Sequence, residues 1–199
     1  MAVVGDILFY RQDQIDLDTV LRNQGNAGVR KLVEKLPDSA FAKHSDDELV
    51  AQVFAKAHIA PLTLALEAAK TKVQEVTVDT RNIFGDFAQV KGLSATKEIP
   101  FTGEEDLWHL RPSSFDLNPP RGEVGGKTIV VGIEVTEDQS DQAVAYVADT
   151  IKKIQENIER QNVQIKPFND SLPSLIHPVV QQRRARLGKA ADLLKKLQG

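Results

Sequence analysis

The amino-acid sequence predicts an α+β protein with amino-terminal helices, a small, mainly antiparallel sheet and a carboxy-terminal antiparallel helical hairpin. Apolar residues recur at helical spacing over residues 1–60, alternate every second position in parts of 61–137, and return to helical spacing over 138–199. Of the 199 residues, 41% are hydrophobic and 27% are charged, which is the composition of an ordinary folded protein. We therefore expect a single domain, residues 1–199, built from these three parts.

The amino-terminal part carries the signals of several short helices. Apolar residues at helical spacing flank a glycine-containing break at residues 25–28, and the pattern ends before Pro37, which predicts two short helices. Ser45 and Glu48 form a capping box, in which the serine hydroxyl accepts a free backbone amide and the glutamate reaches back to the cap amide. A helix from this box to about Ala57 is expected.

The middle part alternates as half-buried strands do. Val76 and Val78 alternate with polar residues, and β-like runs occupy 96–101 and 128–136. Residues 62–67 fit either a strand or a helical turn. A proline-rich stretch between the two runs, residues 111–122, is expected to be an ordered loop or a sheet edge, because proline removes a ladder donor.

Two apolar seams at helical spacing dominate the carboxy-terminal part. The first predicts a helix from Ser140 to about Gln164, and the second predicts another helix towards the end of the chain. Prolines and polar residues between them are expected to break the helix, so that the two segments fold back as a hairpin. The seams are Val144, Val147, Ile151, Ile154 and Ile158, then Ile176, Val180, Leu187, Ala190, Leu194 and Leu197, and the break holds Pro167, Asn169, Asp170 and Pro173.

Charge is distributed unevenly along the chain. Residues 166–199 hold seven Lys or Arg and two Asp, a net charge of +5, so that the first 165 residues carry −8 of the total of −3. Such a basic tail can meet an acidic partner or nucleic acid, or it can pack on the acidic part of its own protein. The second interpretation is the favoured one.

Three arginines of the tail are candidate binding residues. Arg183 lies in the apolar seam, where a buried guanidinium needs a carboxylate or carbonyl partner. The favoured interpretation is that its stem packs while its head reaches water, and the alternative is contact with a partner protein or a phosphate backbone. Arg184 and Arg186 project to other sides and are expected to face solvent.

A second group of candidate binding residues lies in and next to the proline-rich stretch. Trp108, Arg111, Phe115 and Arg121 combine aromatic and guanidinium groups, which can form a recognition surface. The favoured interpretation is that the tryptophan and its neighbours close one end of the sheet.

The sequence offers no catalytic motif. Residues 125–128 read Gly-Gly-Lys-Thr, but Arg121 stands where a phosphate-binding loop needs glycine and a strand follows instead of a helix, which favours a tight turn. Glu134 lies on a strand that would suit a metal-dependent nuclease, yet Thr136 stands where that motif needs lysine. The four histidines are scattered. We expect no catalytic residue, metal or cofactor, and whether the chain is an enzyme stays open.

Other patterns bear on compartment. The chain has no cysteine, which fits a reducing compartment. Its amino terminus lacks the pattern of a secretory signal, and no segment approaches the roughly 20 apolar residues that span a bilayer. We expect a cytoplasmic protein that does not contact a membrane.

Several runs resemble a module found in uncharacterised bacterial proteins of restriction-type or anti-phage defence. The resemblance covers about residues 60–199 and implies a β region, a long helix, a break with Asn and Pro, and an arginine-bearing helix. In such proteins the module can be joined to a separate effector such as a nuclease or TIR domain. The runs that carry it are Pro-Phe-Thr-Gly-Glu-Glu-Asp-Leu-Trp at 100–108, Arg-Pro-Ser-Ser-Phe at 111–115, Asn-Pro-Pro-Arg-Gly-Glu-Val at 118–124, Phe-Asn-Asp-Ser-Leu-Pro at 168–173 and Arg-Arg-Ala-Arg-Leu at 183–187.

Together these patterns predict a non-enzymatic recognition or assembly module that acts through protein–protein association in bacterial defence. The contact surfaces would be the hairpin and the 103–121 loop, and exposed seams would favour self-association. One alternative is nucleic-acid binding by the basic carboxy-terminal helix. A degenerate nuclease is the third hypothesis.

Overall fold

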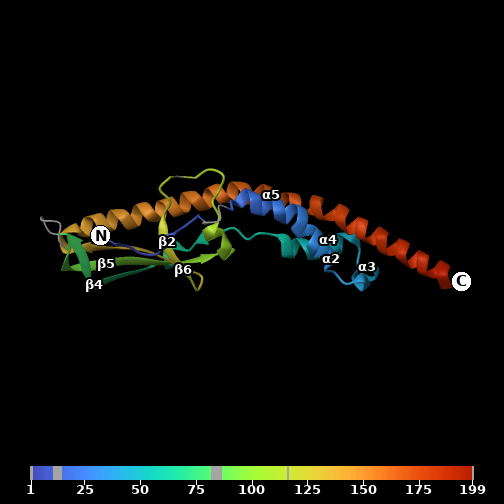
Figure 1. Ribbon diagram of the computed structural model, residues 1–199, viewed down its shortest axis with the longest axis horizontal. Coiled ribbons are helices and arrows are strands. Elements are labelled where there is room, and N and C mark those ends of the chain that lie inside the picture. The colour runs from blue at the N-terminus through green and yellow to red at the C-terminus, as the bar shows by residue number, and fades with distance from the viewer. Residues whose placement is uncertain (1, 11–14, 82–86, 116, 199) are drawn as a thin grey trace. The chain divides into compact units, whose positions relative to one another are not determined.

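The computed structural model describes residues 2–10, 15–81, 87–115 and 117–198. Helices and a mainly antiparallel sheet confirm the α+β class. The residues cluster into two compact units (Figure 1). Unit 1 is Met1–Leu17 with Ala60–Asn162, and unit 2 is Asp18–Ile59 with Val163–Gly199. Each unit joins segments that are distant in sequence, whereas the sequence analysis divided the chain into three consecutive parts.

Unit 1 is built on an antiparallel sheet in the order β2-β6-β7-β5-β3, with β1 paired to β7 and β4 paired to β5. The residues after β3 form a short 3₁₀ turn, η2 (Leu66–Ala68), so the 62–67 segment holds both structures that its sequence allowed. The strands are β1 (Ala2–Val3), β2 (Asp6–Ile7), β3 (Thr63–Leu64), β4 (Lys70–Arg81), β5 (Phe87–Thr102), β6 (Arg121–Gly125) and β7 (Thr128–Thr136).

The turn between β6 and β7 confirms the interpretation of the Gly-Gly-Lys-Thr run. Gly126 and Lys127 both have positive φ angles, +57° and +63°, as a two-residue hairpin turn requires. The Thr128 hydroxyl donates to the Gly125 carbonyl at 2.8 Å and closes the turn. A glycine at the first turn position avoids the steric cost of a positive φ, so this run is a turn and not a phosphate-binding loop.

One face of the sheet packs against the first part of helix α5 (Ser140–Gln198), as Figure 1 shows. Ile133 and Val135 of β7 are buried against Ala143 of the helix. Alternate residues of β7 are fully buried while most of the others are only half-buried, which is the pattern of an antiparallel sheet with one covered face.

Unit 2 is helical. Ser45 and Glu48 make the expected capping box, with the Ser45 amide 2.8 Å from Glu48 Oε2. The glycine-containing break is instead one turn of π-helix that joins α1 to α2 without interruption. The elements before α5 are α1 (Leu17–Asn23), the π-helix η1 (Gln24–Gly28), α2 (Val29–Glu34), α3 (Asp38–Lys43) and α4 (Asp46–Ala57). They bury Val29, Val33, Leu49 and Val53 against Leu172, Ile176 and Val180 of α5.

The predicted carboxy-terminal hairpin is wrong, because α5 runs as one helix of 59 residues through Pro167, Pro173 and Pro178. A proline inside a helix costs about 3 kcal/mol. The apolar seam, however, keeps its helical register across all three, and Ile165 and Leu172 are fully buried. Burial of one such side chain contributes about 1.5–3 kcal/mol, so the packed seam offsets the prolines.

Asn169, which the sequence analysis placed in a helix break, anchors the helix. Its side-chain amide donates to the Ile59 carbonyl at 2.9 Å, and its Oδ1 accepts the Ile59 amide at 3.1 Å. Both backbone groups of Ile59 are thus satisfied by a single helical side chain. This pair of hydrogen bonds stabilises α5 at a position where the polar residues predicted that the helix would end.

Candidate protein-interaction surface

Arg183 is buried in unit 2 and fully engaged there. Its side chain is 8% exposed, and it donates to the Val33 carbonyl and, at 2.9 Å, to Asp38 Oδ1. Its guanidinium carbon lies 4.9 Å from the centre of the Phe41 ring. The interpretation that its head reaches water is therefore wrong, and its carbonyl and carboxylate partners lie within the same unit.

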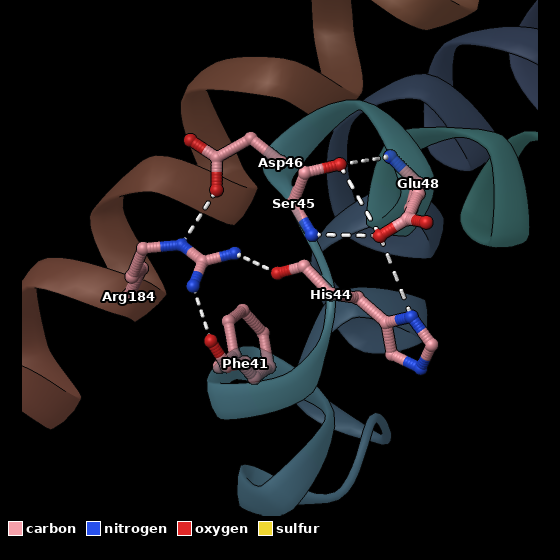
Figure 2. Close-up of polar contacts among 6 residues, drawn as sticks. All are labelled: Phe41, His44, Ser45, Asp46, Glu48 and Arg184. Atoms are coloured by element: carbon pink, nitrogen blue, oxygen red, sulfur yellow. Dashed lines mark hydrogen bonds and ion pairs between the residues drawn. The ribbon is translucent and has the colours of Figure 1, made fainter.

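Arg184 joins α5 to the connection between α3 and α4 (Figure 2). Its Nε donates to Asp46 Oδ1 at 2.6 Å, and its two terminal nitrogens donate to the carbonyls of Phe41 and, at 2.7 Å, His44. Its side chain is 36% exposed, so the expectation that it faces solvent is wrong. The sequence could not show this, because the acceptors include backbone carbonyls about 140 positions away.

Arg186 remains exposed, as expected, and pairs with Glu34 at 2.5 Å. The hydrogen bond from Arg186 holds the pKa of Glu34 below its ordinary value. Lys166 pairs with Asp170 at 3.2 Å. The arginine cluster, defined as Arg183, Arg184 and Arg186, therefore packs on acidic groups of its own protein, in agreement with the favoured interpretation of the basic tail.

Acidification is expected to weaken unit 2 through Glu34 and Glu48. Their pKa values are lowered in the fold, that of Glu34 chiefly by the hydrogen bond from Arg186 and that of Glu48 chiefly by the backbone amide of Ser45. A lowered carboxyl pKa stabilises the fold fully above the ordinary value of 4.5 and loses this contribution as the pH falls through the folded-state value.

The measurement is the urea midpoint, followed by circular dichroism, at pH 6 and pH 3 for the parent chain and for Glu34→Gln with Glu48→Gln. We expect the double variant to lose less stability on acidification than the parent. Equal losses in the two proteins would contradict this assignment.

Beyond the arginine cluster, α5 continues as a helical end with an uncovered apolar side. Every residue from 188 to 198 is exposed. We define the terminal stripe as Ala190, Leu193, Leu194 and Leu197, whose spacing places them on one side of the helix. Its leucines are 58%, 55% and 76% exposed, respectively. Asp192 and Lys195 lie on the opposite side of the helix, and Lys189 and Lys196 flank the stripe next to Leu193.

Unit 2 also has a groove of about 420 Å³ between α1, η1 and α5. Its apolar floor comes from Leu21, Gly25, Phe168 and Leu175. A side-chain carbon at Gly25 would lie 3.4 Å from both Leu175 and Phe168, so the glycine keeps the groove open. An ion pair between Asp18 and Arg22, at 2.7 Å, lies at its edge. The sequence analysis missed this groove and Leu193, because only the fold shows which parts of an amphipathic helix are covered.

Trp108 closes the core of unit 1 and is unavailable to a partner. It is 0% exposed, and its ring lies 5.4 Å from Phe9 and 5.2 Å from Phe101. Gln161 of α5 donates to the carbonyls of Leu107 and Leu110 at 2.8 and 2.7 Å and ties this turn to the helix. Of the two interpretations of Trp108, the structure agrees with the closing role.

The other candidates from this region lie at the surface of unit 1. The Arg111 guanidinium stacks 4.2 Å above the Phe115 ring, and both line a groove of about 300 Å³. Phe115 is 44% exposed. Arg121 is exposed on β6, opposite Ile7 of β2. The structure therefore brings Arg111 and Phe115 together, while Arg121 lies outside the lining of this groove.

The described part of the chain offers no arrangement for catalysis at the positions considered. Within it, no group of three or more His, Cys, Asp or Glu residues is placed to hold a metal ion. Glu134 lies opposite Ser94 of β5 and Ala2 of β1, so its cross-strand neighbours supply neither a second carboxylate nor a lysine.

Comparison with known proteins found no matching family model, no matching curated protein and no matching solved structure. Among the described residues, no helix combines the length and apolar character needed to cross a bilayer.

Proposed function

We propose that this protein is a protein-association module, and that it acts in the bacterial anti-phage defence that the resemblance of residues 60–199 implies. The observation that supports the proposal is the terminal stripe of α5, whose three leucines are more than half exposed. Every residue from 188 to 198 is exposed, so a partner that covers the terminal stripe removes its apolar surface from water. A contact of this kind needs no catalytic group.

The small size of the stripe limits the binding free energy that a single contact can supply. Burial of a leucine contributes about 1.5–3 kcal/mol, so three leucines that are already partly covered supply roughly 3–6 kcal/mol. Association costs about 4–15 kcal/mol. A partner that contacts the stripe alone would bind weakly, and a stable complex requires additional surface or a reciprocal contact.

Nucleic-acid binding is less well supported than protein association. The three arginines of the cluster donate to carboxylates and carbonyls of unit 2, which leaves Lys189, Lys195 and Lys196 as the cations of the helical end. Three phosphate contacts would give a salt dependence of only about −2.7 in log–log slope, far below that of strong DNA-binding proteins.

A site-specific photo-crosslinker tests the proposal. Introduced at Leu193, it is expected to form covalent adducts with a protein in bacterial cells that express the full chain, because this position lies on the terminal stripe. The matched control carries the crosslinker at Lys195, which lies on the opposite side of the helix from Leu193. Nuclease treatment of the adducts is expected to leave their mass unchanged.

Protein adducts from Leu193 that exceed those from Lys195 support the proposal. Equal yields from both positions, no adduct from either, or adducts that nuclease removes would each refute it.

A further inference from the structure

We infer that the edge of strand β4 binds an extended segment of another protein. The segment adds to the sheet as a further strand, places apolar side chains in a groove between β4 and α5, and carries acidic residues that face nearby lysines. This surface belongs to unit 1 and shares no residue with the terminal stripe, so the inference goes beyond the proposed function and does not depend on it.

Strand β4 lies at an edge of the sheet. It pairs with β5 over all 12 of its residues, and the described residues supply no strand on its other side. Residues 70–75 of the strand are all exposed. In an antiparallel pair every second residue directs its backbone N–H and C=O groups away from the partner strand. The β4 edge is therefore a long row of backbone groups to which another strand can hydrogen-bond.

A groove of about 300 Å³ lies between β4 and α5. On the strand side it is lined by Thr71 and Val73, and Val73 is 60% exposed. Its wall on α5 is apolar, and Val144 in that wall is 72% exposed. The apolar side of α5 is thus wider than the sheet covers, and the uncovered part lies next to β4. The residues of this wall are Val144, Val147, Ala148 and Ile151.

A strand added to β4 would reach this groove with its side chains. Neighbouring strands lie about 4.8 Å apart, and every second side chain points to the same face. Val73 is on the face that packs against α5, because it lies opposite Ala95, which packs on the cluster that contains Ala143. Side chains on that face of the added strand would therefore contact the uncovered side of α5. The volume is at the small end of binding pockets, which begin at about 300 Å³, and suits a few aliphatic side chains.

The charge beside the groove favours an acidic segment. Residues 70–74 of β4 and the residues opposite them, 94–98 of β5, hold three lysines and one glutamate, a net charge of +2. Within the described ranges none of the three lysines forms an ion pair. Asp149, the acidic residue of the α5 wall, already pairs with Lys153 at 2.9 Å. Carboxylates of a partner would therefore complement this charge. The residues counted are Lys70, Lys72, Lys97 and Glu98.

A second copy of β4 fits this groove less well than a different segment does. Two β4 strands paired antiparallel about a two-fold axis keep the same face towards α5, so the residues that would enter the groove are those on the face of Val73. Only Val73 among them is apolar, and most of the apolar wall would stay uncovered. Lysines on an edge strand also oppose pairing between copies. The residues on this face are Thr71, Val73, Glu75, Thr77 and Asp79.

Selection from a phage-displayed library on the immobilised full chain tests the chemistry of the partner. The probes are random peptides of about eight residues, a common strand length. We expect enriched sequences with aliphatic residues at alternate positions and more Asp and Glu than Lys and Arg. Fluorescence anisotropy with labelled synthetic copies of these sequences then gives dissociation constants. Lys72→Glu with Lys97→Glu is expected to raise the dissociation constant at least tenfold.

Matched variants locate the bound peptide. Val144→Lys is expected to raise the dissociation constant at least tenfold, because Val144 lines the groove. Ala145→Lys introduces the same side chain at the next position, which is exposed and outside the groove lining, and should leave binding unchanged. Leu193→Asp, on the terminal stripe, should also leave it unchanged. Both α5 positions near the groove are exposed, so circular dichroism should show the helix content of the parent.

Amide hydrogen exchange followed by NMR tests whether the peptide adds as a strand. Saturating peptide is expected to slow exchange at least tenfold at every second residue of β4 around Val73, because those N–H groups become bonded to the added strand. The amides between them are already bonded to β5 and should change little. Protection of this alternating kind distinguishes strand addition from a ligand that only fills the groove.

Four results would overturn the inference. They are a library without enriched sequences, enriched peptides that bind Val144→Lys as well as the parent, binding without alternating protection of β4, and protection of β4 that appears without peptide as the mass doubles from 22.0 kDa. The last would assign the edge to a second copy. Peptides that lose affinity only in Leu193→Asp would reject binding at β4 and leave the proposed function intact.

Discussion

Trp108→Ala is expected to lower the free energy of unfolding by about 3–5 kcal/mol, which is the usual cost of deleting a large buried ring. The indole is fully buried and packs between Phe9 and Phe101. Because the surrounding strands and helix restrict collapse, the alanine would leave a cavity. Urea unfolding followed by circular dichroism measures the loss.

Two comparison variants make this prediction specific. Phe115→Ala removes a ring that is 44% exposed and is expected to cost less than about 1 kcal/mol. Trp108→Phe keeps most of the packing and removes Nε1, which is buried and has no hydrogen-bond partner among the described residues. Removing an unsatisfied buried donor offsets part of the packing lost with the smaller ring. We therefore expect the free energy of unfolding of Trp108→Phe to fall by about 1–2 kcal/mol. Equal losses in Trp108→Ala and Phe115→Ala would show that Trp108 is not a core residue.

Features determined by neighbouring residues were predictable from the sequence. The β-like run 128–136 located β7, the Gly-Gly pair marked its hairpin turn, and Ser45 with Glu48 marked the start of α4. Each of these signals acts over a few residues, because it depends on backbone dihedral angles and local hydrogen bonds. Such features do not depend on the arrangement of distant segments.

Features determined by distant residues were not predictable in the same way. Proline at 167, 173 and 178 carries a strong local preference against helix, but side chains from α2 and α4 hold α5 together through that region. Arg184 was expected at the surface, and its acceptors lie between Phe41 and Asp46. Tertiary packing overrides a local preference when the buried area is large, and a single sequence does not reveal that area.

The candidate site shows the same division. Helical spacing identified Ala190, Leu194 and Leu197 as one side of an amphipathic helix. It did not identify the residue beyond which the other helices of unit 2 no longer pack on that side. The cover ends just after the arginine cluster, because Arg183 and Arg184 contact the residues around α3 and none of the described residues 188–198 is buried. The uncovered leucines become a candidate contact surface only once that limit is known.

Arg183→Ala is expected to destabilise the fold by about 3 kcal/mol, chiefly through lost packing. The side chain is 8% exposed, while its partner Asp38 is 72% exposed, so solvent weakens the ion pair itself. The Val33 carbonyl keeps a second donor, the Leu36 amide at 3.1 Å, when the guanidinium is removed. What remains is a cavity beside Phe41, and cavities of this size cost about 2–5 kcal/mol.

Arg183→Met separates packing from charge, because methionine refills most of the space without a guanidinium. If packing dominates, this variant should lose only about 1 kcal/mol in urea unfolding. Arg186→Ala, which removes an exposed partner of Glu34, should also lose less than about 1 kcal/mol. Equal losses for Arg183→Met and Arg183→Ala would instead assign the contribution of Arg183 to its hydrogen bonds with Val33 and Asp38.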